Sequence, residues 1–273
     1  MDVHFFSTGN DFPYVYYLAV MSALRTQKCD RINIWCTEES DSKYLAMLGD
    51  MKKVFIYNIY PFDIIPKLEA VIKKDTDSPT ITKIRRAHLK DILGWSVLYN
   101  EGGLLLDLDT FCFKDLVGLL SNKDIATCVH STWRFGPMLY PFENAIVLAK
   151  IRSDVIKEAY DESVAFLRPE IDAGFIWGCT GPQALSNAIH KNYHLVKFLE
   201  PGTFGCMVEE LGNPAPSLYT EGGLLPSNAR VFHMYFSSYR EQLKGMDSDF
   251  IMRSNIPYAR LVRGTLPLQD WRI

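Results

Sequence analysis

Long apolar runs and a strong net charge are both absent from this chain of 273 residues. No segment approaches the roughly 20 consecutive apolar residues that a membrane-spanning helix requires, and the N-terminus lacks the basic and then apolar order of a secretion signal. A net charge of −3 provides no positive field that would attract nucleic acid or an anionic membrane. We therefore expect a soluble, cytoplasmic protein with no membrane span and no nucleic-acid partner.

The cysteine spacing of a zinc site or a redox centre is also absent. The six cysteines form no Cys-x-x-Cys pair, and none has a histidine at zinc-ligand spacing. Several stand inside apolar segments, as Cys36 and Cys128 do, which is typical of buried thiols. We therefore predict reduced, buried cysteines. Internal repeats and low-complexity segments are absent as well, which favours an ordinary folded domain.

What the chain does contain is an alternation of strand-like and helix-like segments. Its length, with 48% hydrophobic and 22% charged residues, suits one large α/β domain. Strand-like segments occupy residues 3–6, 31–36 and 53–57, and helical spacing begins at Pro13 and near Ser40 between them. This order is typical of a Rossmann-like, mainly parallel central sheet with helices on both faces.

One later segment combines a helix, a glycine stop and a short strand. Apolar side chains at helical spacing predict a helix that begins near Thr80. Gly102 and Gly103 end it, because glycine accepts the left-handed turn found after a helix. The following residues, 104–106, are all leucine, and such a run suits a strand that is covered on both faces.

Two carboxylates, Asp107 and Asp109, follow this strand. We expect them to point to the same side, because strand side chains repeat every two residues. Carboxylates held together repel one another unless a cation lies between them. Mg²⁺ and Mn²⁺ bind carboxylates and complete their shell with substrate phosphates. Most Asp-x-Asp pairs are solvated turn residues, but a strand end in an open α/β sheet is where ligands bind, which favours a metal site here.

The run Lys90-Asp91-Ile92-Leu93, then Leu98-Tyr99-Asn100-Glu101-Gly102-Gly103, then Asp107-Leu108-Asp109 resembles a family signature. It is similar to that of the retaining GT-A glycosyltransferases with a DXD sugar-binding region, which include polysaccharide and glycolipid sugar transferases and the clostridial glucosylating toxins. The resemblance implies a GT-A fold, a nucleotide-sugar donor and a divalent metal. One position departs from the pattern: Gly94 stands where the family has an arginine that helps to hold the donor sugar, so the sugar is left open.

The resemblance also implies a set of site residues. Its metal ligands are Asp107, Asp109 and His233. Its donor-binding residues are Thr8, Gly9, Asp91, Asp107, Asn144 and Ser238. Its catalytic residues are Asp107 and Asp109, and to these we add Asp172 as a carboxylate on the acceptor side. Three alternatives remain open. Residues 7–9 can be a plain surface loop, and Asp172 can have a capping or turn role. His233 can donate to a phosphate, or be an ordinary core or surface histidine, in place of binding the metal.

Positive side chains on the predicted long helix also have two interpretations. They are Lys83, Arg85, Arg86 and Lys90. A solvated helix face suits most of them. One of them can instead face a diphosphate or replace the arginine that is missing at position 94.

We predict a single GT-A domain, residues 1–273, in which residues 1–110 bind the nucleotide sugar and residues 111–273 form the acceptor side. The predicted activity is that of a hexosyltransferase that uses Mn²⁺ or Mg²⁺. It moves a sugar from a nucleotide sugar, above all a UDP-sugar, to a glycan or another hydroxyl acceptor with retention of configuration.

Three alternatives belong to other functional classes. A nucleotidyltransferase acting on sugar phosphates also uses paired aspartates, but it normally has a basic, glycine-rich loop near the first strand, and residues 7–10 contain no lysine or arginine. A glycosidase would use a carboxylate pair without a metal or a nucleotide. A non-enzymatic sugar-binding module would need neither a nucleotide-binding half nor an Asp-x-Asp pair.

Overall fold

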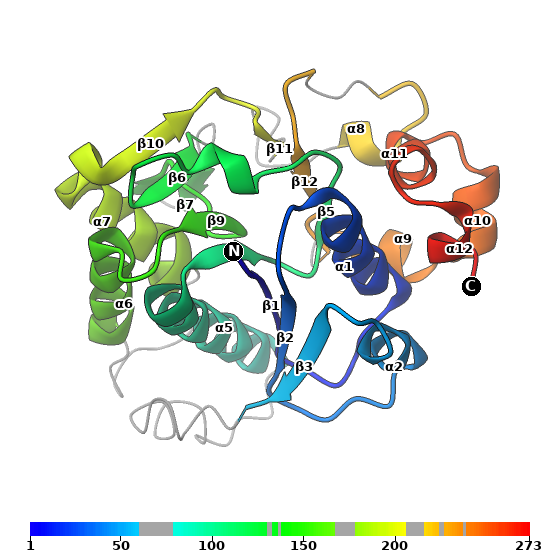
Figure 1. Cartoon of the computed structure of the whole chain (residues 1–273), viewed down its shortest axis with the longest axis horizontal. Helices are drawn as coiled ribbons and strands as arrows, with labels where there is room; N and C mark the ends of the chain where they lie inside the picture. The colour runs from blue at the N-terminus through cyan, green and yellow to red at the C-terminus, as the bar shows by residue number, and fades with distance from the viewer. Residues whose placement is uncertain are drawn as a thin grey trace.

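Short apolar segments form the central sheet of the computed structural model, which describes residues 1–59, 79–129, 133–135, 138–166, 178–205, 216–223, 227–236 and 239–273. The sheet has seven strands (Figure 1). In spatial order they are β10 (Val196–Leu199), β6 (Ile125–Cys128), β9 (Ile146–Ala149), β4 (Gly103–Leu106), β1 (Val3–Ser7), β2 (Ile32–Cys36) and β3 (Val54–Asn58). Most of these strands have fully buried side chains, as a sheet covered on both faces requires.

The direction of the strands confirms the predicted mainly parallel sheet. β1 pairs in parallel with β2 and with β4, β2 pairs in parallel with β3, and β10 pairs in parallel with β6. β9 is the exception, because it runs antiparallel to both of its neighbours, β4 and β6. Its register with β4 places Ile146 opposite Leu106, so the beginning of β9 lies beside the end of β4.

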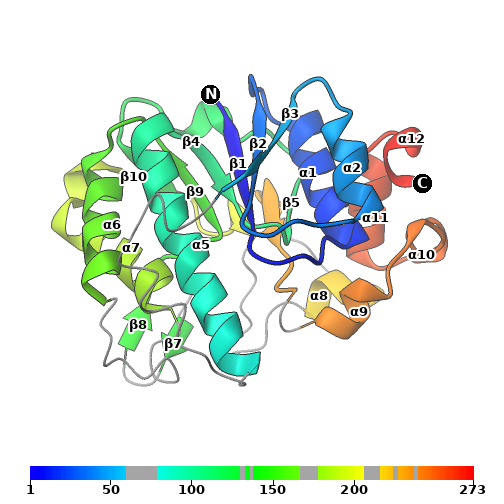
Figure 2. The ribbon, with the colours of Figure 1, turned by 90° about the horizontal axis from the view of Figure 1, so that it is seen from below.

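Helices cover both faces of the sheet, as predicted (Figure 2). One layer contains α1 (Tyr14–Thr26) and α2 (Lys43–Gly49), and the other contains α5 (Pro79–Glu101), α6 (Asp154–Phe166) and α7 (Ala184–Lys191). Successive side chains of β4 pack on opposite faces of the sheet and so contact both layers. Leu104 and Leu106 belong to the apolar cluster of α1, whereas Leu105 belongs to that of α5. The predicted start of the long helix near Thr80 agrees with the first residue of α5, Pro79.

A smaller three-stranded sheet follows the end of β4. It contains β11 (Phe204–Gly205), β12 (Val231–His233) and β5 (Thr110–Cys112), in that order. β12 runs antiparallel to β5 and places His233 opposite Thr110. Since β5 begins one residue after Asp109, this pairing brings a late segment of the chain to the two predicted carboxylates.

The remaining elements are short. A separate hairpin consists of β7 (Trp133–Phe135) and β8 (Met138–Tyr140). Single-turn helices occupy Val117–Leu119, Cys179–Gln183 and Tyr193–Leu195. The C-terminal part contributes α8 (Pro216–Tyr219), α9 (Arg240–Lys244), α10 (Ser248–Arg253), α11 (Pro257–Thr265) and α12 (Leu268–Trp271). Within the described part of the chain, no helix is long and apolar enough to cross a lipid bilayer.

Two glycines and a buried histidine join α5 to the sheet. Gly102 and Gly103 have φ angles of 66° and 111°, which confirms the predicted glycine stop. A Cβ atom on Gly103 would lie 2.5 Å from the Asp2 carbonyl oxygen, so this position has no room for a side chain. His4 Nε2 lies 3.0 Å from the Gly102 carbonyl oxygen, and burial lowers the pKa of His4 to about 4. His4 is therefore a neutral histidine in the fold at neutral pH.

The cysteines agree with the sequence prediction as far as they are described. Cys29, Cys36, Cys112, Cys128 and Cys179 are all buried and free. Burial raises the pKa of the Cys36 and Cys128 thiols to about 11, which keeps both protonated and unreactive at neutral pH. These residues serve packing.

Candidate metal centre

Asp107 and Asp109 lie in a tight turn between β4 and β5. The Asp107 carbonyl oxygen accepts hydrogen bonds from the Thr110 backbone N–H at 3.1 Å and from its hydroxyl at 2.7 Å. The prediction that the two carboxylates converge is thus correct in outcome, but the reason given for it, strand alternation, is wrong. The turn folds Asp109 back toward Asp107. The Asp107 N–H still donates to the Ala145 carbonyl oxygen at 2.9 Å, which ties the turn to the beginning of β9.

The segment after β12 holds Asp109 in place. The backbone N–H of Met234 donates to the Asp109 carbonyl oxygen at 2.6 Å, and that of Phe236 donates to Asp109 Oδ2 at 2.7 Å. Tyr235, between them, has a φ of 50°, a left-handed conformation that is uncommon for a tyrosine. This turn aims one backbone donor at one oxygen of the Asp109 carboxylate, while the other oxygen, Oδ1, lies 3.3 Å from His233 Nε2.

The three predicted metal ligands form one group. Asp107, Asp109 and His233 each offer a ligand atom, and these atoms all lie within 4.8 Å of one another. The side chains are partly exposed, at 19%, 16% and 12% respectively, so a ligand can reach them from solvent. Two carboxylates and one imidazole fit a divalent cation such as Mn²⁺ or Mg²⁺, and three protein ligands leave further coordination positions for phosphate oxygens.

Glu143 and Tyr235 contact His233, and reasoning from the sequence singled out neither of them. Glu143 Oε2 lies 3.2 Å from His233 Nδ1, and the Tyr235 hydroxyl donates to Glu143 Oε1 at 2.7 Å. The Tyr235 ring packs on the imidazole with 3.9 Å between centroids. A carboxylate that accepts the Nδ1 proton leaves Nε2 as the atom that faces a metal, which is the usual arrangement around a histidine ligand.

The charged side chains of this group shift one another's pKa values. Burial opposes the charged form of His233, but Asp109 and Glu143 outweigh it and raise the pKa of His233 well above its ordinary value. Burial likewise opposes ionisation of Asp109, yet His233 and the Phe236 N–H outweigh it and lower the pKa of this carboxyl group. For Asp107, burial dominates over the nearby Lys90 and raises the pKa. Asp109 is therefore the more firmly ionised of the two carboxylates.

Lys90 reaches this group from α5. Its ammonium nitrogen forms an ion pair with Asp107 Oδ1 and lies 3.6 Å from Asp91 Oδ1. Burial disfavours the charged amine, but Asp107, then Asp91, outweigh burial and raise the pKa of Lys90. Of the two interpretations of the positive side chains on this helix, the structure places Lys90 in the site and not on a solvated face.

Asp91 and Asn144, both predicted to bind the donor, contact each other. Asn144 Nδ2 donates to Asp91 Oδ1 at 2.6 Å, and the Thr180 hydroxyl donates to Asp91 Oδ2 at 2.9 Å. All three side chains are buried. Gly181 packs against this group, because a Cβ atom there would lie 2.7 Å from both Asn144 Nδ2 and Asp91 Oδ2. The result is a preorganised group of polar atoms beside Lys90.

The other predicted donor residues are only partly placed. Thr8 and Gly9 lie in the loop after β1, where a Cβ atom on Gly9 would be 3.3 Å from Arg86 Nη1. Arg86 lies one helical turn before Lys90, and its Nη2 donates to Glu38 Oε1 at 2.8 Å. Two predicted site residues, Asp172 and Ser238, lie outside the described residues.

Gly94 explains how closely α5 approaches the sheet. A Cβ atom at this position would lie 2.9 Å from Leu105 Cδ2, in the middle of β4. Leu105 is fully buried in the apolar cluster that α5 shares with α6 and α7, so it has little room to move away. The absence of a side chain at position 94 therefore serves close packing of the helix on the strand that carries the carboxylates.

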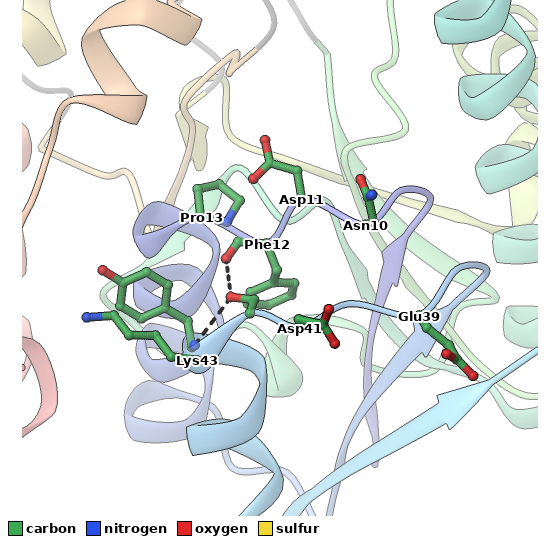
Figure 3. Close-up of a pocket in the computed structure, with 9 residues that line it drawn as sticks. Asn10, Asp11, Phe12, Pro13, Glu39, Asp41 and Lys43 are labelled. Atoms are coloured by element: carbon green, nitrogen blue, oxygen red, sulfur yellow. Dashed lines mark hydrogen bonds between the residues drawn. The ribbon is translucent and has the colours of Figure 1, made fainter.

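A separate recess of about 430 Å³ lies between the loops that follow β1 and β2 (Figure 3). Asn10, Asp11, Phe12, Pro13, Glu39, Asp41, Ser42, Lys43 and Tyr44 line it. Three of these residues are acidic and one is a lysine. This lining does not favour a phosphate group, so the recess does not compete with the Asp107 group as a site for a diphosphate.

Comparisons with known proteins relate the chain to solved structures by its fold. The sequence matches no protein-family model and no curated protein. The galactosyltransferase LgtC in complex with donor and acceptor sugar analogues superposes with a TM-score of 0.53 and 14% identity, over 100% of this chain and 99% of that chain. An active-site mutant of LgtC gives a TM-score of 0.50 and 13% identity, over 92% and 99%. The PaToxG glycosyltransferase gives 0.48 and 17%, over 74% and 70%.

Identities this low establish the fold alone. The likeness to LgtC extends over the whole length of both chains, and the central sheet with helices on both faces agrees with it. The predicted fold class is therefore confirmed: this chain has the GT-A fold, and its structural neighbours are glycosyltransferases.

Proposed function

We propose that this protein is a metal-dependent glycosyltransferase that takes a sugar from a nucleotide sugar, most suitably a UDP-sugar, and attaches it to a hydroxyl group of a glycan or another acceptor. The observation that carries the proposal is the convergence of Asp107, Asp109 and His233 at one end of β4 in a GT-A fold. LgtC, which has the same fold, is described with donor and acceptor sugar analogues.

Asp107, Asp109 and His233 would hold a divalent cation, Mn²⁺ or Mg²⁺. When bound, such an ion stabilises the negative charge that develops on the leaving nucleoside diphosphate. The chain prepares the ligands in advance: the Phe236 N–H fixes one oxygen of Asp109, and Glu143 fixes the orientation of the His233 ring. Ligands that are already oriented lose little freedom when the ion and the diphosphate bind.

The polar group formed by Asp91, Asn144 and Thr180 is suited to the donor sugar. Each carboxylate oxygen of Asp91 already accepts one hydrogen bond and can accept another from a sugar hydroxyl. In this proposal Thr8 and Gly9, in the 1–110 half, approach the nucleotide, and Ser238 adds a donor contact. The 111–273 half receives the acceptor, with Asp172 on that side.

Transfer with retention of configuration fits the residues proposed for the site. The leaving phosphate can itself take the proton of the acceptor hydroxyl, so the reaction needs no strong protein nucleophile. Lys90 and the buried polar group of Asp91 then act by holding charge and orientation, and they form no covalent bond with the sugar. The stereochemistry of the product, read by NMR of the new glycosidic bond, tests this part of the proposal.

The experiment that tests the proposed function measures UDP binding with and without Mn²⁺. We expect UDP to raise the unfolding temperature only when Mn²⁺ is present, and we expect Asp109→Asn to abolish this effect, because it removes the charge of a metal ligand while keeping an oxygen for the Phe236 N–H. Asp161→Asn, which alters an exposed ion pair with Lys157, is the matched control and should behave like the unaltered chain.

Release of UDP from a panel of UDP-sugars then identifies the donor. Binding of free sugars without any metal dependence would instead identify a sugar-binding module. Binding of nucleoside triphosphates together with sugar phosphates would identify a nucleotidyltransferase. Either result would refute the proposed function.

A further inference from the structure

Lys90 occupies an unusual position between two carboxylates that have different proposed tasks. Its ammonium group pairs with Asp107, a proposed metal ligand, and lies 3.6 Å from Asp91, a proposed donor-sugar ligand. Its side chain is 17% exposed, so solvent reaches part of it. A lysine in this place can therefore interact with whatever binds beside Asp107.

The carboxylate that Lys90 contacts is one that a metal would also use. Lys90 pairs with Oδ1 of Asp107, and Asp107 is one of the three side chains whose ligand atoms cluster within 4.8 Å. An ammonium group in contact with one oxygen of this carboxylate repels a divalent ion that approaches either oxygen. Metal binding at Asp107 and the present position of the Lys90 ammonium group therefore compete.

Asp91 is the second carboxylate within 4 Å of the ammonium group among the described residues. Both of its oxygens already accept hydrogen bonds, from Asn144 and from Thr180. A diphosphate bound through a metal at Asp107 brings new negative charge to the same place. The lysine side chain is long and flexible enough to turn toward such a group.

Position 94, one helical turn after Lys90, leaves no room for a cation of its own. It packs directly on Leu105 of β4. An arginine at 94 would have to displace a fully buried leucine. Residues 90 and 94 are one helical turn apart, so Lys90 can supply positive charge to the same side of α5.

We propose that Lys90 is the donor site's own movable cation: it neutralises Asp107 before the metal arrives and contacts the diphosphate of the nucleotide sugar once the metal occupies Asp107. This inference rests on the proposed function. It assigns to Lys90 two opposite effects, because the same charge weakens binding of the metal alone and strengthens binding of the nucleotide in the presence of the metal. A purely structural lysine would not show that opposition.

The test compares Lys90→Met, which keeps the apolar stem and removes the charge, with Lys90→Arg, which keeps the charge. Lys157→Met, at an exposed ion pair on α6, is the matched control. Binding of Mn²⁺ without nucleotide is measured from the electron paramagnetic resonance signal of free Mn²⁺. Binding of UDP at saturating Mn²⁺ is measured by calorimetry.

For Lys90→Met we expect Mn²⁺ alone to bind about three- to tenfold more tightly, because a repelling charge beside Asp107 is gone. We expect UDP at saturating Mn²⁺ to bind at least about tenfold more weakly, because a charge-assisted contact with the diphosphate is lost. Lys90→Arg should retain UDP binding, and Lys157→Met should change neither constant.

Two results for Lys90→Met would overturn the inference: both constants unchanged, or weaker binding of Mn²⁺ alone. If Lys90→Met has a lower unfolding temperature, Mn²⁺ should raise the unfolding temperature of this variant by more than it raises that of the unaltered chain, because the metal replaces the missing cation. Failure of this restoration also counts against the inference. If the unaltered chain does not bind UDP with Mn²⁺, the proposed function fails, whereas the Mn²⁺ measurements still decide whether Lys90 competes with the metal.

Discussion

Replacement of Glu143 by glutamine tests how the fold prepares His233 for a metal. Glu143 accepts two hydrogen bonds through different oxygens, one from His233 Nδ1 at 3.2 Å and one from the Tyr235 hydroxyl at 2.7 Å. Glutamine has a single oxygen, so one of these two groups must face its NH₂ group. If that group is the imidazole, Nδ1 becomes an acceptor and the proton moves to Nε2, the atom that a metal needs.

The expected size of the effect follows from the burial of this contact. The side chains of Glu143 and His233 are 14% and 12% exposed, so water screens their interaction only weakly. A hydrogen bond to a charged group of this kind contributes about 1.5–3 kcal/mol. Loss of the group that orients a histidine ligand typically lowers metal affinity by about 10- to 100-fold. We therefore expect Glu143→Gln to weaken Mn²⁺ binding by at least about tenfold.

Two measurements test this prediction: the dissociation constant of Mn²⁺, and the protonation of each His233 ring nitrogen from ¹⁵N chemical shifts of the imidazole. Glu158→Gln, which alters an exposed ion pair with Lys191, controls for the loss of a negative charge elsewhere and should leave both unchanged. A folded Glu143→Gln protein that binds Mn²⁺ as tightly as the unaltered chain, with the same protonation of the His233 ring nitrogens, would refute the reasoning.

Two further predictions concern the donor site and the fold. Gly181→Ala places a methyl group 2.7 Å from Asn144 and Asp91. We therefore expect this substitution to weaken the binding of UDP-sugars more than the binding of UDP, and to leave Mn²⁺ binding unchanged. Equal losses of affinity for UDP and UDP-sugars, measured by calorimetry, would contradict this prediction. Burial lowers the pKa of His4 to about 4, below the ordinary 6.5. As the pH falls, His4 therefore takes up a proton in the unfolded chain before it does so in the folded chain, and this favours unfolding. The contribution of His4 to the free energy of unfolding is therefore fully present above about pH 6.5, and it falls by about 2 kcal/mol between pH 7 and 4.5. This fall should be absent in His4→Gln when urea unfolding is compared at the two pH values. An unchanged pH dependence in the variant would contradict the prediction.

Local sequence patterns were sufficient for most elements of the fold. The strand-like segments near Val3, Ile32 and Val54 form β1, β2 and β3, because short segments rich in apolar residues between turn-forming segments suit strands of a covered sheet. Gly102 and Gly103 ended α5 for a reason that is visible in the sequence, since both have positive φ angles. The direction of β9 was not visible, because strand direction depends on the path of the connection and not on the residues of the strand.

The site residues also separate into those that local sequence can group and those that only tertiary packing brings together. The grouping of Asp107 with Asp109 is local, although a turn produces it and not strand alternation. The approach of His233 was expected from the family resemblance alone, and in the structure it depends on the pairing of β12 with β5. Lys90 had two open interpretations in the sequence, because only the packing of α5 on β4 decides whether its side chain meets solvent or Asp107.

The antiparallel strand β9 is the feature of the sheet that assembles the two halves of the site. Because β9 runs opposite to β4, the residues just before it, Glu143 and Asn144, lie at the edge where β4 ends in Asp107. Asn144 then reaches Asp91 on α5, and Glu143 reaches His233 at the end of β12. A parallel β9 would place both residues at the opposite edge, a strand length of roughly 13 Å away for four residues. One reversed strand thus connects the proposed sugar-binding group to the proposed metal ligands, so a change in its register should disturb both together.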